Sequence, residues 1–187
     1  MAVRLTFKPL TLDRWPDFEI LFGENGACGG CWCMAWRWKH KEFLQKKGAG
    51  AKRAFKKIVE GKTAPGILAY SDKEPVGWIA IAPREQFTRL EGSRVLAPID
   101  DQPVWSIPCF FVRKDFRHKG VSVQLLEAAA DFARKQKAKI VEGYPYDLDK
   151  EMPPPFVWTG LASAFEKAGF QEAARRSKTR PIMRKQL

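Results

Sequence analysis

A basic loop that contains a glycine is the segment of this sequence with the clearest capacity for chemistry. Gly120 lies between a predicted buried strand and a predicted amphipathic helix, and Arg117, Lys119 and Ser122 flank it. The first N–H groups of a helix have no partner within the helix, and the helix dipole is positive there, so such an end binds anions. Glycine lets the backbone approach a phosphate closely. The predicted phosphate-binding residues are Arg117, His118, Lys119, Gly120, Val121 and Ser122.

Three cysteines near the N-terminus form a second group with chemical potential. Cys28, Cys31 and Cys33 lie within six residues, and His40 follows them. Zinc binds four such ligands, but structural zinc sites usually come as two spaced pairs, whereas this segment has one crowded triplet. Tryptophans interleave with the cysteines and point to packing or to a substrate wall. Buried core thiols or a role in an acceptor pocket are therefore favoured over a zinc site.

The elements that must position these residues follow from periodicity. Apolar patterning predicts strands over Val3–Pro9, Gly66–Ser71, Val76–Ala82, Val104–Arg113, Lys139–Gly143 and Phe170–Met183. Helical spacing predicts helices from Thr11 to Gly23, across Glu42–Glu60 with a break at Gly48, after Gly120, and over Trp158–Ala168. The segment 83–101 is polar and reads as irregular. Pro108 lacks an N–H and marks a bulge or an unpaired edge.

Composition places the chain among globular proteins. Its 187 residues suit a single domain, residues 1–187. The composition, with 45% hydrophobic and 29% charged residues, is that of a folded chain and excludes a disordered one. The net charge of +12 suits a polyanionic partner: nucleic acid, anionic lipid or a phosphorylated cofactor. We find no apolar run that could span a membrane and no signal peptide, and therefore expect a cytoplasmic protein with free thiols. Exposed edge strands would allow a homodimer.

The chain resembles the GNAT superfamily of N-acetyltransferases over roughly residues 66–183. The family's pyrophosphate motif is Gln/Arg-x-x-Gly-x-Gly/Ala, and this chain has Arg117-x-x-Gly120-x-Ser122. The helix that begins with Gln124-Leu125-Leu126 and the late Gly169-Phe170 also fit the family. The resemblance implies acetyl-CoA as acyl donor and an α/β fold. Its central sheet would be mixed and mostly antiparallel, with helices on both faces and one parallel pair that splays at the cofactor slot.

The resemblance also implies where the cofactor lies. Strand Cys109–Val112 would splay from strand Ile140–Gly143 and leave a slot for pantetheine, which places Phe110, Phe111 and Val112 along the cofactor. An N–H near Phe111 or Val112 would polarise the thioester carbonyl. The acceptor amine, on a small molecule or a peptide, would enter from the other face and attack directly, so that positioning supplies much of the rate.

Two residues depart from the family pattern. Ser122 replaces the usual glycine or alanine, which a small side chain should allow. Phe165 stands where many members have a tyrosine that is thought to protonate the leaving thiolate. Tyr144, Tyr146 or solvent would then protonate the leaving thiolate. Because a free thiol has a pKa near ~8.5, its thiolate is a fair leaving group and needs only modest help. Glu142 is a candidate base, with Asp147 just beyond it, and a structural or solvated carboxylate is the alternative for Glu142.

Two other functions stay open at this level. The net charge and a Cys3His zinc site would suit a nucleic-acid-binding module, which predicts one equivalent of zinc and salt-sensitive binding. The absence of the family tyrosine at Phe165 would suit a CoA-binding regulator without chemistry. We expect neither zinc nor a nucleic-acid or membrane partner, and we predict catalytic roles for Glu142 and Tyr144 in an acetyl-CoA-dependent N-acetyltransferase.

Overall fold

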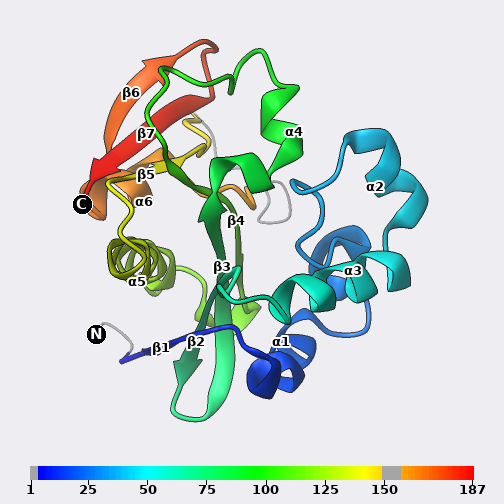
Figure 1. Cartoon of the computed structure of the whole chain (residues 1–187). Helices are drawn as coiled ribbons and strands as arrows, with labels where there is room; N and C mark the ends of the chain where they lie inside the picture. Colours follow the sequence, from blue (N-terminus) through cyan, green and yellow to red (C-terminus); the bar gives the residue numbers. More distant parts are fainter. Residues whose placement is uncertain (1–3, 149–156) are drawn as a thin grey trace.

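The computed structural model describes residues 4–148 and 157–187 and shows a seven-stranded sheet with helices on both faces (Figure 1). The strands are β1 (Thr6–Pro9), β2 (Gly66–Ser71), β3 (Glu74–Pro83), β4 (Trp105–Val112), β5 (Ile140–Gly143), β6 (Gln171–Arg175) and β7 (Pro181–Gln186). Their order in the sheet is β1-β2-β3-β4-β5-β7-β6. The pair β4–β5 is parallel and the other neighbours are antiparallel, as the sequence predicted.

The helices divide between the two faces of the sheet (Figure 1). They are α1 (Trp15–Phe22), α2 (His40–Lys46), α3 (Ala49–Val59), α4 (Thr88–Glu91), α5 (Val121–Lys135) and α6 (Ala162–Lys167). The first three lie to one side of β3 and β4, and α5 and α6 lie to the other. None of the described helices is long and apolar enough to cross a membrane.

Aromatic side chains fill the face covered by α1 and α3. The rings of Phe18 and Phe55 lie 5.0 and 6.0 Å from Trp78 of β3, both edge-on. Trp32, from the loop after α1, stacks on Phe22 at 5.8 Å. Edge-to-face pairs add about 0.5–1.5 kcal/mol each beyond the burial of apolar area. Trp32 therefore serves packing here, which was one of the two roles predicted for the tryptophans near the cysteines.

Helix α5 covers the opposite face through one apolar stripe. Val121, Leu125 and Ala129 are buried at helical spacing. Gly77 of β3 lies beneath this stripe, and a Cβ atom on it would come within 3.2 Å of Leu125 and 3.4 Å of Val121. The bare glycine thus lets the helix pack closely on the sheet, and this packing fixes where the first turn of α5 stands.

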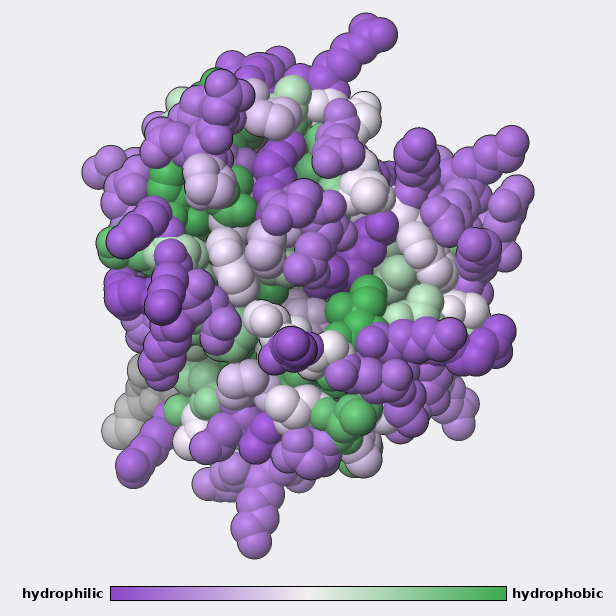
Figure 2. All heavy atoms as spheres, in the orientation of Figure 1, coloured by the Kyte–Doolittle hydropathy of each residue, from purple (hydrophilic) through white to green (hydrophobic). Residues whose placement is uncertain are grey.

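The structure differs from the predicted elements in two places. The last helix begins at Ala162 rather than Trp158, because Gly160 has a φ of +85° and Leu161 is extended, so the helix cannot reach further back. The segment 83–101 contains helix α4 and a short turn at Arg84–Gln86, where an irregular segment was expected. On the face in Figure 2, hydrophilic side chains cover most of the surface and apolar ones form small separate patches.

Candidate active site

Strands β4 and β5 separate partway along their length. Their pairing consists of Trp105 with Val141, Ser106 with Glu142, and Ile107 with Gly143. Strand β5 ends at Gly143, whereas β4 continues to Val112. The extra residue of a bulge lies at this point, since Cys109 and Ser106 of β4 face Ala80 and Ala82 of β3. Pro108 lies inside that bulge, which was one of the two roles predicted for it. The separation of β4 from β5 beyond Ile107, called the opening below, is the splay that the resemblance implies.

Two backbone N–H groups of β4 point into this opening. The N–H of Phe110 donates to the Trp158 carbonyl at 2.7 Å, whereas the N–H of Arg113 donates to Val76 of β3 at 2.9 Å. Because successive N–H groups along a strand alternate in direction, Val112 shares the side of Phe110 and Phe111 faces β3. The expectation that Phe111 could polarise the thioester is therefore corrected. Phe110 and Val112 have the right orientation, and the carbonyl of Trp158 already engages Phe110.

Aromatic rings close the α6 side of the opening. Phe165 is fully buried, and its ring lies 5.8 Å from Phe110 and 5.0 Å from Phe170. A Cβ atom on Gly143 would lie 2.1 Å from the Phe165 ring, so the ring fills the space above that glycine. Phe165 therefore stands as a packing residue at the opening, and it carries no proton to donate.

The predicted phosphate loop has the geometry of an anion site. Gly120 has a left-handed φ of +75° and caps helix α5, whose first turn closes with the N–H of Gln124 donating to the Gly120 carbonyl at 3.2 Å. Within the described residues, no backbone N–H from 118 to 122 donates to another group of the protein. A Cβ atom on Gly120 would have no neighbour within 4 Å, so the space in front of these N–H groups is open. This cradle fits a diphosphate.

Cationic side chains surround the cradle. Arg117 is half-buried, and its Nε donates to the Val112 carbonyl at 3.1 Å, which ties the loop to the end of β4. Lys119 is exposed and lies over the ring of Phe116 at 5.2 Å. Arg113 is instead held by ion pairs with carboxylates near the surface. Arg117 and Lys119 are thus the cations placed to face a bound phosphate.

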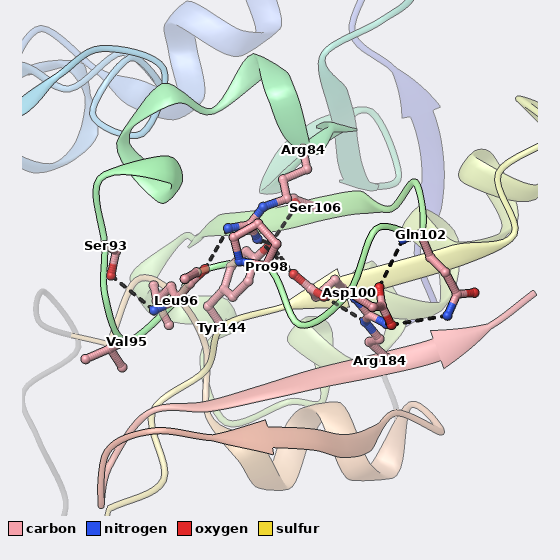
Figure 3. Close-up of polar contacts among 12 residues, drawn as sticks. Arg84, Ser93, Val95, Leu96, Pro98, Asp100, Gln102, Ser106, Tyr144 and Arg184 are labelled. Atoms are coloured by element: carbon pink, nitrogen blue, oxygen red, sulfur yellow. Dashed lines mark hydrogen bonds and ion pairs between the residues drawn. The ribbon is translucent and has the colours of Figure 1, made fainter.

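Glu142 and Tyr144 lie together in a buried polar network. Figure 3 shows Tyr144 of this network with Arg84, Ser106 and Arg184 around it. One Glu142 oxygen accepts from Arg84 at 2.9 Å and from the Tyr144 hydroxyl at 2.7 Å, and the other accepts from Arg184 at 2.7 Å. The Tyr144 hydroxyl also accepts from Arg84 at 2.6 Å. It lies 2.7 Å from the Ser106 hydroxyl, which must then donate, because Tyr144 has already used its single proton.

This network favours the structural role for Glu142. Both of its oxygens are occupied, and its side chain is only 1% exposed, so no acceptor amine reaches it in this arrangement. Burial, together with the charge of Glu142, raises the pKa of Tyr144 well above its usual value, which keeps the phenol protonated. Asp147 is exposed and pairs with Arg175 at 2.7 Å, and Arg180 stacks on the ring of Tyr146. None of the four predicted acid or base candidates is free at the opening.

The same arginines hold the loop between α4 and β4. Arg84 donates to the Leu96 carbonyl at 2.6 Å, and Arg184 makes two hydrogen bonds to Asp100 at 2.6 and 3.0 Å. Figure 3 shows this loop drawn over Tyr144 and against β7. The bonds to Arg184 lower the pKa of Asp100 to about 2. Arg84 and Arg184 therefore hold this loop in place against the sheet.

The cysteines separate into one exposed and three buried thiols. Cys28 is exposed, whereas Cys31, Cys33 and Cys109 are buried. These three line one small cavity together with Ala35, Trp36, Ala80, Phe87, Pro108 and Trp158. In the part of the chain that the structure describes, no three His, Cys, Asp or Glu side chains are placed to hold a metal ion. The meeting of Cys33 with Cys109 could not be read from the sequence, because 75 intervening residues separate them.

Comparisons with known proteins agree with this architecture. A model of the acetyltransferase (GNAT) family matches residues 32–144, more than half of the chain. A GNAT-family acetyltransferase from Listeria monocytogenes has a TM-score of 0.60 and 10% identity, with 100% of this chain and 98% of that chain covered. PaiA N-acetyltransferase from Thermoplasma acidophilum, solved with coenzyme A, has a TM-score of 0.54 and 14% identity, with 98% and 99% covered.

A further solved structure, the ribosomal-protein-S5-alanine acetyltransferase of Vibrio fischeri, has a TM-score of 0.57 and 9% identity, with 97% of this chain and 92% of that chain covered. At such identities the likeness shows the fold alone. No curated protein matches the chain. The family model, the splayed parallel pair and the glycine-capped loop converge, and the chain belongs to the GNAT family of acetyltransferases.

Proposed function

We propose that this protein transfers an acetyl group from acetyl-CoA to an amine. The observation that carries the proposal is the cradle at residues 118–122, which lies open in front of α5 and is tied by Arg117 to the end of the splayed strand β4. A diphosphate at the cradle would place the rest of the cofactor along β4, because the loop follows that strand directly.

This chain's own residues would do three things. Arg117, Lys119 and the N–H groups of the cradle would bind the pyrophosphate, with Ser122 as a further donor. Val112 would offer its N–H along the opening. Phe110 would offer its N–H to the thioester carbonyl once the Trp158 carbonyl gives up its 2.7 Å hydrogen bond. When bound, acetyl-CoA supplies the activated acyl group.

The acceptor would approach from the face that carries Trp36, Trp158 and the buried thiols. That face is opposite helix α5, which covers the other side of β4. The fixed loop that contains Leu96 and Asp100 also lies on this side. The acceptor class expected here is an amine on a small molecule or a peptide, and the family resemblance implies direct attack on the thioester.

Calorimetric titration with acetyl-CoA tests the proposal. We compare wild type with Gly120→Glu and with Gly120→Gln, which share the backbone strain of a non-glycine residue at φ +75° but differ in charge. The glutamate variant should bind at least tenfold more weakly than the glutamine variant, since each ~1.4 kcal/mol of repulsion costs a factor of ten. The difference should shrink at high salt.

Two results would contradict the proposal. If wild type does not bind acetyl-CoA, the cradle does not serve this cofactor. If both variants bind as wild type does, the cofactor binds elsewhere. Should acetyl-CoA bind but no amine in a screen accept the acetyl group, a CoA-binding regulator becomes the better reading.

A further inference from the structure

A short segment between β5 and α6 covers the edge of β4 along which the cofactor is expected. This segment, residues 157–160, is called the strap below. Its Trp158 carbonyl accepts from the Phe110 N–H at 2.7 Å. The pairing of β4 with β5 ends at Ile107, and Pro108 has no N–H, so Phe110 carries the first N–H that points into the opening. The strap therefore occupies the N–H that the proposed function assigns to the thioester carbonyl.

The Trp158 carbonyl and a thioester carbonyl exclude each other at this N–H. The group has a single hydrogen, and a carbonyl oxygen at 2.7 Å leaves no space for a second acceptor in line with it. Because both acceptors are carbonyl oxygens, the strap makes in the free protein the hydrogen bond that the cofactor would make in the complex. Acetyl-CoA can hold the Phe110 N–H only after the strap has moved.

Three further contacts hold the strap against the rest of the molecule. The ring of Trp158 lies 5.7 Å from the ring of Trp36. Gly160 closes a tight turn, because its N–H donates to the Val157 carbonyl at 2.9 Å. The carbonyl of Gly160 accepts from the Tyr146 N–H at 2.8 Å. The strap is therefore a defined part of the fold in the free protein, with contacts on both sides of the bond to β4.

Gly160 allows the strap to approach the rings beneath it. Its φ is +85°, and a Cβ atom on it would lie 3.0 Å from the ring of Phe110 and 3.0 Å from the ring of Phe165. Carbon atoms pack without strain at about 3.5–4.0 Å, so these neighbours would have to shift. A side chain at this position would push the strap away from β4, which gives a way to open it by substitution.

Thr159 makes the closed strap less stable. Its side chain is fully buried, yet its Oγ1 atom has no hydrogen-bond partner among the described residues. A buried hydroxyl without a partner has lost its hydrogen bonds to water and gained none, which opposes closure. Packing and the bond to Phe110 thus close the strap while Thr159 opposes closure, and a ligand that takes over the bond can reverse this balance.

We propose that the strap is an autoinhibitory contact that acetyl-CoA must displace from β4, and that it weakens acetyl-CoA binding to the free enzyme. This inference rests on the proposed function, because it places the acyl end of the cofactor at Phe110. When only a fraction of the protein is competent to bind, the observed affinity falls by that fraction. Variants that destabilise the closed strap should therefore bind acetyl-CoA more tightly, a gain that damage to a merely structural segment would not produce.

Two substitutions with opposite effects on the strap test this inference by calorimetry with acetyl-CoA. Gly160→Ala adds the Cβ atom that meets both rings, and it should tighten binding roughly two- to tenfold, the range that one net hydrogen bond contributes. Thr159→Val keeps the shape of the side chain and removes the unpartnered hydroxyl, so it should stabilise the closed strap and weaken binding by a similar factor. Thermal unfolding should show the reverse order, with Gly160→Ala less stable than wild type and Thr159→Val more stable.

Two controls isolate the strap. Gly48→Ala shares the backbone strain, since Gly48 has a φ of +76°, but this residue precedes α3 and its Cβ atom would have no neighbour within 4 Å. It should lower the melting temperature and leave the affinity for acetyl-CoA unchanged. The second control is a ligand, the phosphorylated ADP portion of CoA, which contains the diphosphate but no pantetheine. It should bind wild type and all three variants alike, because it does not reach the strap.

The outcomes separate this inference from the proposed function. If wild type binds acetyl-CoA but Gly160→Ala binds it no more tightly, the inference is wrong and the proposed function stands. If Gly160→Ala does not fold, Thr159→Val decides, and unchanged or tighter binding overturns the inference. An equal shift in affinity for the ADP portion would show that the variants act on the cradle, which also overturns it. If wild type does not bind acetyl-CoA, both proposals fail.

Discussion

Replacement of Glu142 by glutamine tests whether this residue holds the structure or acts on substrate. The change keeps the shape of the side chain but removes the charge that faces Arg84 at 2.9 Å and Arg184 at 2.7 Å. The side chains of these arginines are only 11% and 10% exposed, so water cannot replace the lost carboxylate well. Arg184 keeps Asp100, whereas Arg84 loses its only carboxylate partner among the described residues.

The magnitude follows from the burial of the network. Removal of one partner from a buried ion pair costs about 3–5 kcal/mol, because it leaves an uncompensated charge. That is a large part of a typical stability of roughly 5–15 kcal/mol. For a chain of this size, it corresponds to a fall in melting temperature of roughly 6–20 °C. Glu142→Gln should therefore fold at low temperature but unfold much earlier than wild type.

The assay is urea and thermal unfolding, with Glu74→Gln as a matched control. Glu74 pairs with Arg113 at 3.0 Å, but its side chain is 68% exposed, so its loss should cost about 0–1 kcal/mol. If Glu142→Gln is no less stable than this control, the structural reasoning is refuted. Loss of acetyl transfer in a fully stable Glu142→Gln variant would restore Glu142 as the base.

Three further predictions concern the loop and the opening. The pKa of Asp100 is lowered in the folded state, so its ion pair should stabilise the fold fully above pH ~4 and lose that contribution toward pH ~2. The stability difference between wild type and Asp100→Asn should therefore vanish as pH falls through this window, and a difference that persists at low pH would contradict the assignment. Gly143→Ala should lower the free energy of unfolding by about 1–3 kcal/mol or more, because the added Cβ atom clashes with the Phe165 ring. The control Gly92→Ala should be neutral or slightly stabilising, because its Cβ atom meets only one atom, at 3.9 Å. Equal melting temperatures of the two variants would refute this packing. Acetyl-CoA should change the tryptophan fluorescence, because the Trp158 carbonyl must leave the Phe110 N–H and the indole of the same residue moves with it. Trp158→Phe should therefore reduce the change, and an unchanged signal in the variant would argue against the displacement.

Local patterns were enough to predict the frame of the molecule. The strand that ends near Val112, the glycine at residue 120 and the apolar stripe of the following helix are contiguous in sequence, so their geometry depends on short-range rules. Pro108 predicted a bulge or an unpaired edge for the same reason, since a missing N–H acts on its own strand, and the structure shows the bulge. The family resemblance then supplied the splayed pair and the cofactor that suits it.

The roles of individual polar side chains depended on distant partners. The sequence predicted Glu142 as a possible base. In the structure, Arg84 and Arg184, which are 58 and 42 residues away along the chain, occupy both of its oxygens. The direction of each β4 N–H also required the sheet register, which set Phe110 rather than Phe111 toward the opening. A one-residue change of register reverses every N–H, and no local pattern fixes it across a bulge.

The sequence by itself determined an acetyltransferase-like sheet and a loop that can hold a diphosphate, because phosphate recognition at a helix start needs only neighbouring residues. Tertiary structure alone decided which polar groups meet. It placed Glu142 between Arg84 and Arg184, and it set the Trp158 carbonyl on the N–H of Phe110. Those contacts join segments that are far apart along the chain, and only the packing of the two faces against the sheet specifies them.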